Sequence, residues 1–362
     1  MRPDHCHVLP LLADPDHYDP STWNLRQRDD LRAYWVDLFR THFPSLAREA
    51  IAEAGGGPDI RAKMDEATRQ FNAFLDAAAE NRDDRPVLTI LEICKVREEV
   101  LRGQNVDDPY RLAKERENAS ALAVLSGVLK ELDSLPHDER GLAITQGIFA
   151  GNIFDMGATD TERLFRDAGT VDFRKVRDKL KPRPWLIDDG DAWLAKFNRD
   201  NPFRCALLFV DNAGSDIVLG MIPFARELLR RGARVILTAN TQPSLNDVTI
   251  DELKVLIDHV AGMDAVIGDA LVDGRLQLVA SGNWLPLIDL RCVSAELAEL
   301  ARREPIDLIV LEGMGRAVES NLHARFTCDA LKIAMIKDPC VAKCLGGELY
   351  DLVLKFEPGK GK

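Results

Sequence analysis

The sequence predicts a doubly wound, mainly parallel α/β sheet that follows an N-terminal all-α domain. The chain has 362 residues, which corresponds to two domains at roughly 150 residues each. From about residue 29 to about residue 180, apolar residues recur three and four positions apart, as in amphipathic helices. After residue 204, short apolar runs alternate with helical stretches, as in βαβ units. We therefore expect an α-helical domain at 1–183 and an α/β domain at 184–362.

The helical part is divided by turn sequences rather than by a linker. Tyr34, Leu38 and Phe39 lie on one face of the first expected helix. The breaks between helices are AGGGP at 54–58, DDP at 107–109, Pro136 and the glycine-flanked segment 151–157. These short breaks predict helices that pack closely on one another.

Seven runs in the second part predict β-strands. They are apolar throughout rather than alternating, which is typical of strands that are covered on both faces. The predicted strands span 205–210, 234–239, 264–268, 276–280, 306–311, 332–336 and 351–356. The helix after the first strand has Ile217, Met221, Phe224 and Leu228 on one stripe and stops at Gly232, a normal C-terminal signal. This helix has the length of one βαβ crossover in a Rossmann-like sheet.

Composition and charge disfavour several classes of protein. Hydrophobic residues make up 46% of the chain and charged residues 29%, which is too apolar for disorder and too polar for a membrane bundle. The net charge of -12 disfavours nucleic acid and anionic membranes as partners. No apolar run reaches the ~18 residues of a spanning helix, and the N-terminus lacks a signal-peptide core.

The seven cysteines form no CxxC pair, which fits buried thiols in a reducing compartment, so we expect a cytoplasmic protein. The oligomeric state stays open.

Polar side chains follow the predicted strands at the edge where ligands bind in open parallel sheets. Asp211 and Asn212 come directly after the first strand, and Asp247 lies in the segment after the second. Their oxygens are the donors that Mg²⁺ or Mn²⁺ accepts. Any one of them alone could instead be a helix N-cap. Three at neighbouring strand ends predict a metal site.

Glycines and cations at the same edge predict a phosphate site. Gly313 and Gly315 follow the fifth predicted strand and would let backbone N–H groups face a phosphate closely. The glycines alone could form a plain tight turn. Arg316 and Lys337 would add positive charge on the same rim. Together these residues predict a phosphate cradle that faces a metal.

Several motifs resemble those of the metal-dependent damage-control phosphatases, a family first catalogued as a domain of unknown function. In the α/β part they are FVDNAGSDIVLGMIPFARELLRRG at 209–232, LNDVT at 245–249, VLEGMGRAVESN at 310–321 and AMIKD at 334–338. In the helical part they are DPYRLAKERENASAL at 108–122 and AGNIFDMGA at 150–158. The EGMGR sequence marks one subfamily, which includes stand-alone plant proteins and the C-terminal phosphatase domain of an animal pantothenate kinase paralogue. The resemblance covers nearly the whole chain.

The resemblance implies roles for individual residues. It assigns metal binding to Asp211, Asn212 and Asp247, which the strand positions also select. The subfamily motif corresponds to Glu312, Gly313, Met314, Gly315 and Arg316, of which the last four would contact the phosphate together with Lys337. The resemblance also implies a loop with Asn152 and Asp155 over the mouth of the site. Other subfamilies carry a lysine near Asn240, and we expect Asn240 to contribute to phosphate binding in its place.

The function implied by the resemblance is hydrolysis of phosphomonoesters of small metabolites. For this subfamily the substrate would be 4′-phosphopantetheine or its oxidised forms, in coenzyme A metabolism. Mg²⁺ or Mn²⁺, or alternatively Co²⁺ or Ni²⁺, would activate water for direct attack on the phosphorus. Asp216 is the candidate for orienting or deprotonating that water, although it could simply complement the helix N-terminus.

A non-catalytic nucleotide- or coenzyme-binding module on the same fold is the alternative function. Three oxygen ligands around a hard cation favour the enzyme, because a pure binder has no use for them. A dinucleotide binder would also carry GxGxxG directly after the first strand, where this chain has DNAGSD.

Overall fold

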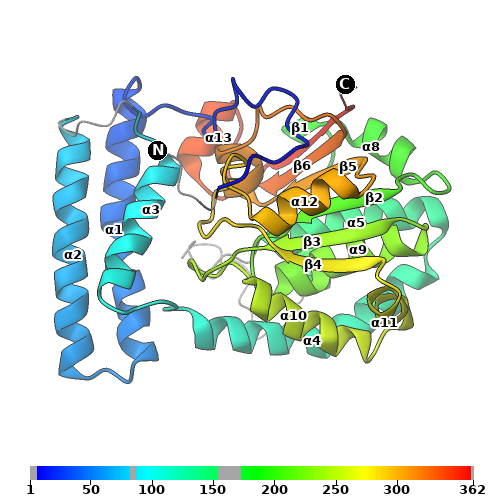
Figure 1. Cartoon of the computed structure of the whole chain (residues 1–362), viewed down its shortest axis with the longest axis horizontal. Helices are drawn as coiled ribbons and strands as arrows, with labels where there is room; N and C mark the ends of the chain where they lie inside the picture. Colours follow the sequence, from blue (N-terminus) through cyan, green and yellow to red (C-terminus); the bar gives the residue numbers. More distant parts are fainter. Residues whose placement is uncertain (1–5, 82–86, 154–172, 360–362) are drawn as a thin grey trace.

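The computed structural model describes residues 6–81, 87–153 and 173–359. A seven-stranded sheet lies at its centre, with strand order β1-β7-β6-β5-β2-β3-β4 (Figure 1). The strands are β1 (Ile187–Asp188), β2 (Cys205–Phe209), β3 (Arg234–Ala239), β4 (Leu276–Ala280), β5 (Leu308–Glu312), β6 (Asp329–Met335) and β7 (Leu352–Glu357). Strands β6, β5, β2, β3 and β4 are parallel, whereas β7 is antiparallel to β6 and parallel to β1. The predicted fold class is confirmed.

Helices cover both faces of the sheet. One face carries α4 (Arg111–Ser134), α5 (His137–Asn152), α7 (Phe173–Asp178), α8 (Gly190–Phe197), α9 (Ile222–Arg230), α10 (Ile250–Ala261), α11 (Ala265–Val272) and a π-helix, η1 (Asp216–Met221). The other carries α12 (Ala295–Arg303), α13 (Pro339–Leu345) and a second π-helix, η2 (Met314–Glu319). In β2, Leu207 and Phe209 face one core while Ala206 and Leu208 face the other, and all four are fully buried. This explains why the strands lack alternation.

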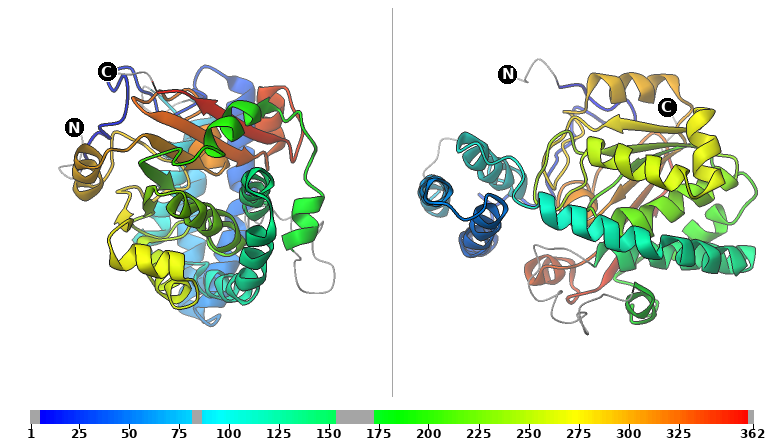
Figure 2. Two further views of the ribbon diagram at one scale, coloured as in Figure 1. Left: turned by 90° about the vertical axis from the view of Figure 1, so that its right-hand side faces the viewer. Right: turned by 90° about the horizontal axis from the view of Figure 1, so that it is seen from below.

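The first three helices stand side by side at one end of the molecule (Figures 1 and 2). They are α1 (Asp29–Glu53), α2 (Pro58–Ala79) and α3 (Ile90–Gly103). The ring of Phe71 in α2 lies 4.8 Å from that of Phe43 and 6.2 Å from that of Phe39 in α1. Helices α4 and α5 pack instead against η1, on the sheet. The domain boundary at residue 183 stays a prediction.

One predicted strand is wrong. Residues 265–268 begin α11, and Asp264 is the N-cap of this helix, because its side chain accepts a hydrogen bond from Ile267 N at 3.2 Å. The other six predicted strands are present, with ends shifted by up to three residues, such as β6, which begins at Asp329. The two-residue strand β1 was not predicted, since it is too short to show a pattern.

The expectation of seven free thiols is also wrong. Cys6 and Cys292 form a disulfide, because the N-terminal segment pairs with the chain before α12, as in the 2.8 Å hydrogen bond from Leu9 N to Leu290 O. Their separation of 286 residues hides this pairing from the sequence. The other five cysteines are free. Among the described residues, no helix is long and apolar enough to cross a membrane. The cytoplasmic location stays a prediction.

Two glycines let α5 approach η1 backbone to backbone. A Cβ atom on Gly151 would lie 3.0 Å from Asp216 Cα and from Ser215 O, and one on Gly220 would lie 3.3 Å from Ile148 Cα. This close packing brings the end of α5 to the beginning of η1, beside the carboxyl edge of the sheet.

Replacing Gly151 by alanine should therefore destabilise the protein. We expect Gly151→Ala to lower the free energy of unfolding by about 1–3 kcal/mol, because the new methyl group must displace backbone atoms. Urea denaturation measures this. The control is Gly103→Ala at the end of α3, where a Cβ atom would meet nothing within 4 Å. There the lost backbone freedom of glycine should instead raise stability by about 0.5–1 kcal/mol, and a loss of equal size in both variants would contradict the interpretation.

Candidate metal and phosphate site

The polar strand ends meet at the switch point of the sheet. Asp211 follows β2 and Glu312 ends β5, and these two strands are neighbours from which the chain winds in opposite directions. Lys337 follows β6 on one side, and Asn240 follows β3 on the other. Four adjacent strands therefore contribute to one site, as the sequence predicts.

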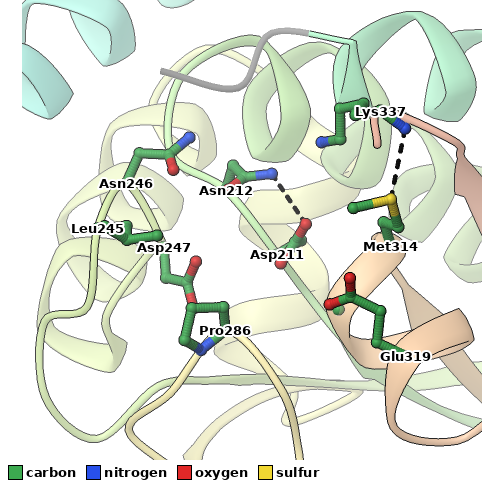
Figure 3. A pocket seen from close by; sticks show the side chains of 10 residues that line it. Asp211, Asn212, Leu245, Asn246, Asp247, Pro286, Met314, Glu319 and Lys337 are labelled. Atoms are coloured by element: carbon green, nitrogen blue, oxygen red, sulfur yellow. Dashed lines mark hydrogen bonds between the residues drawn. The ribbon is translucent and has the colours of Figure 1, made fainter. Parts of the chain in front are cut away.

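The structure brings the three expected metal ligands together. Asn212 and Asp247 form an isolated antiparallel bridge, and Val248 N donates to Asp211 O at 2.9 Å. Asp211, Asn212 and Asp247 line one cavity of about 90 Å³ at the carboxyl edge of the sheet (Figure 3). All three are at least nine-tenths buried.

A second group of acids overlaps the first. Oxygen atoms of Asp211, Asp216 and Glu312 lie within 4.8 Å of one another, and all three side chains are buried. The Nδ2 atom of Asn152 donates to Glu312 Oε1 at 2.7 Å, to Asp216 Oδ2 at 3.0 Å and to Asp211 Oδ2 at 3.3 Å. The Nδ2 atom of Asn212 donates to Asp211 Oδ2 at 2.8 Å and to Asp216 Oδ2 at 2.9 Å. Two amides thus hold three carboxylates together.

Burial raises the pKa of two of these acids. It raises the pKa of Glu312 well above the usual range, and the neighbouring Asp216 carboxylate raises this pKa further. Burial also raises the pKa of Asp216, although Lys337 opposes this shift. Among the described residues, Asp216 Oδ1 is buried without a hydrogen-bond partner. Hard oxygen donors with an orphaned carboxylate oxygen fit a divalent cation, whose charge would offset that of the buried acids.

The structure places Arg316 and Asn240 behind the acids rather than on the rim. The Arg316 side chain is fully buried and pairs with Asp211 and, at 2.9 Å, with Asp247 Oδ2. Burial lowers the pKa of Arg316 to about 9. Asn240 Nδ2 donates to Asp247 Oδ2 at 2.8 Å. Both residues therefore orient Asp247, and Arg316 also compensates its charge, but neither lines the cavity.

The glycines of the EGMGR motif allow close contact. Gly313 has a φ angle of +95°, and a Cβ atom there would overlap the Asp211 carboxylate. Its N–H donates to Ile333 O at 3.0 Å, so this amide serves the sheet rather than a phosphate. A Cβ atom on Gly315 would lie 2.6 Å from Pro286 O. Met314 and Gly315 line the cavity.

Lys337 and Asn152 connect the cavity to α5. Lys337 lines the cavity, and its Nζ donates to Asn152 O at 2.7 Å. Asn152 is the last residue of α5 and contacts the acids directly, so this end of the expected loop does reach the site. Asp155 and Gly157 lie outside the described residues.

Four lining residues were missed by the sequence analysis, and one of them is Pro286, which lies between β4 and α12. Glu319 lines the cavity beside Met314, because the five-residue spacing of a π-helix puts both on one side of η2 (Figure 3). Leu245 and Asn246 line it from the segment before Asp247. Leu245 and Asn246 could have been found from their nearness to Asp247 in the sequence. Glu319 could not, because the spacing of an α-helix would place it on a different side of the helix from Met314.

One family model matches most of the chain. The model of the damage-control phosphatase ARMT1-like domain matches residues 38–353. The chain belongs to the damage-control phosphatase family. The resemblance inferred from the motifs is confirmed.

Several relatives support this assignment. The chain is 40% identical to the damage-control phosphatase At2g17340 of Arabidopsis thaliana, over 89% of this chain and 87% of that protein. It is 34% identical to the 4'-phosphopantetheine phosphatase of Mus musculus, over 96% of this chain and 48% of that protein. It is 40% identical to pantothenate kinase 2 of Arabidopsis thaliana, over 97% of this chain and 42% of that protein. The chain thus spans less than half the length of the last two relatives.

A solved structure shows the same fold. A DUF89 family protein of Pyrococcus horikoshii matches with a TM-score of 0.59 and 20% identity, over 90% of this chain and 98% of that one. At this identity the likeness concerns the fold alone.

Without a metal, the protein should lose stability as the pH rises. A carboxyl group with a raised pKa binds its proton more tightly in the folded state, so the free energy of unfolding falls between the usual and the raised pKa. The slope from one such proton is about 1.4 kcal/mol per pH unit. Urea denaturation in chelator from about pH 5 to about pH 8 measures the slope.

The matched variant is Asp216→Asn. Its Oδ1 can keep the acceptor contacts with Asn152 and Asn212, while its new N–H takes the position of the orphaned oxygen. Removing one of the two repelling carboxylates should make the slope shallower than in the natural chain. Equal slopes in both proteins would contradict the assignment of the raised pKa to Glu312 beside Asp216.

Proposed function

We propose that the chain is a divalent-metal-dependent phosphatase that hydrolyses phosphomonoesters of small metabolites. The observation that carries this proposal is the convergence of Asp211, Asn212 and Asp247 with Lys337 on one cavity at the switch point of the sheet. Acidic and amide oxygens suit a hard cation, and a lysine suits the phosphoryl oxygens. The names of the mouse and Arabidopsis phosphatases support the same activity.

Asp211, Asn212 and Asp247 would hold the cation, which when bound lowers the pKa of water and polarises the phosphoryl group. Lys337 is held near the acids by its bond to Asn152 O and would donate to the phosphoryl oxygens. Because lysine has three donors and no acceptor, it serves the phosphate rather than the ion. Asp216, with one oxygen unpartnered, is the candidate acceptor for the proton of the attacking water.

We propose 4′-phosphopantetheine or its oxidised forms as the substrate. The cavity of about 90 Å³ has room for a phosphoryl group but not for a pantetheine chain, which would extend past its mouth. Leu245, Pro286 and Met314 make part of the lining apolar, which suits a long uncharged chain. Mg²⁺ and Mn²⁺ fit the oxygen ligands, and Co²⁺ and Ni²⁺ are alternatives.

A screen of phosphorylated metabolites with each of these four cations tests the proposal. We expect phosphate release from 4′-phosphopantetheine only when a cation is present, and none in excess chelator. Full activity in chelator would contradict metal dependence. Tight binding of coenzyme-like ligands without turnover under any cation would favour the non-catalytic module.

Variants of Lys337 and Asp247 should separate phosphate contact from metal binding. Loss of a preorganised charge contact lowers turnover by about 10²–10³-fold, so we expect Lys337→Ala to fall in that range with nearly unchanged metal affinity. Asp247→Asn should lose both turnover and metal affinity, because it removes an anionic ligand. Steady-state kinetics and calorimetric titration with Mn²⁺ measure the two quantities.

Lys343→Ala is the matched control, since Lys343 is an exposed lysine near the end of α13 and does not line the cavity. Its turnover and metal affinity should equal those of the natural chain. Metal affinity weakened equally in Lys337→Ala and Asp247→Asn would contradict the roles assigned to them.

A further inference from the structure

We infer that helix α3 positions Asp247 through a buried hydrogen bond between Ser244 and Glu98. The inference rests on the proposed function, in which Asp247 holds the cation. Ser244 lies in the segment that connects the end of β3 to Thr249, the N-cap of α10. Its Oγ donates to Glu98 Oε1 at 2.9 Å. The two residues are 1% and 2% exposed, so water cannot replace either partner.

Glu98 is itself held in place. The neighbouring Arg97 donates to the same Oε1 from Nε at 3.0 Å and from the guanidinium Nη2 at 2.8 Å. The Arg97 guanidinium lies 5.7 Å from the ring centroid of Phe39 in α1. A buried carboxylate whose charge is paired in this way keeps one orientation. Ser244 therefore contacts a group whose position α3 and α1 determine.

A second contact from α3 holds the preceding residue. The guanidinium Nη2 of Arg102 donates to Pro243 O at 2.8 Å. The same guanidinium lies 4.4 Å from the ring centroid of Trp284, which fixes its direction. Two successive residues of the segment are thus bonded to one helix.

A tight turn transmits this anchor to Asp247. Asp247 N donates to Ser244 O at 3.1 Å. Between them, Leu245 has a φ angle of +49°, a left-handed conformation that persists in leucine only when surrounding contacts impose it. Without the bond between Ser244 and Glu98, Leu245 can return to a negative φ angle. The turn would then open and move Asp247 away from Asp211 and Asn212.

The test is Ser244→Ala in the full chain, with two measurements. Groups that orient a metal ligand affect metal affinity by about 10–100-fold, so calorimetric titration should show Mn²⁺ binding weakened within this range. Turnover should recover when Mn²⁺ is raised to saturation. In the metal-free protein, hydrogen exchange at the Asp247 amide should become about tenfold faster, because this N–H closes the turn. Ser244→Thr, which keeps the hydroxyl, should restore both quantities toward those of the natural chain.

The control is Thr89→Ala, at the N-cap of the same helix. Thr89 accepts a hydrogen bond from Glu92 N at 3.2 Å, so its loss weakens α3 at the end of the helix that precedes Glu98. Mn²⁺ affinity and Asp247 exchange should stay unchanged in this variant. Equal effects in Ser244→Ala and Thr89→Ala would overturn the inference, as would Ser244→Ala with the exchange and affinity of the natural chain. If the natural chain binds no Mn²⁺, the proposed function fails, and the exchange measurement alone decides whether α3 holds the turn.

Discussion

The site depends on keeping three carboxylates together inside the protein. Asp211, Asp216 and Glu312 gather at the point where the sheet changes winding direction, with oxygens within 4.8 Å of one another. Burying a charged group without a partner destabilises the folded protein by several kcal/mol. The residues around these acids therefore have to compensate their negative charge. Asn152 donates to all three acids, and Arg316 pairs with Asp211 from behind. Burial and the neighbouring Asp216 carboxylate raise the pKa of Glu312, and the three acids together could hold a metal ion.

Helices from the first half of the chain complete a site whose cavity is lined by the second half. Asn152 of α5 holds the acids, and Asn118 of α4 accepts a 2.6 Å hydrogen bond from Gly214 N, just after Asp211 and Asn212. Glu98 of α3 accepts one from Ser244, just before Asp247. Each helix therefore contacts a different part of the acidic edge. The loops that follow the strands lie beyond the hydrogen bonds of the sheet, and side chains of these helices stabilise them instead.

The EGMGR motif shows how the same residues serve packing and chemistry. Gly313 adopts a positive φ angle and leaves space for the Asp211 carboxylate, and Gly315 leaves space for Pro286. Arg316 lies in the π-helix η2, and its fully buried side chain pairs with Asp211 and Asp247. Met314 and Glu319, one π-turn apart, face the cavity instead. Most residues of the motif thus support the site from behind, and only Met314 and Gly315 line the cavity.

The sequence by itself determined the main sheet and the acidic side chains at its carboxyl edge. Buried parallel strands must be apolar on both faces, so β2, β3 and β5 were visible as runs, and the acids that follow them had to share one edge. The tertiary structure alone decided which helix contacts which loop, because Asn152 and Glu98 are more than one hundred residues from Glu312 and Ser244. It also decided that 265–268 is helical and that Arg316 is buried. A local pattern reports which faces of an element are apolar, whereas the direction of a buried polar side chain depends on the partners that folding brings to it.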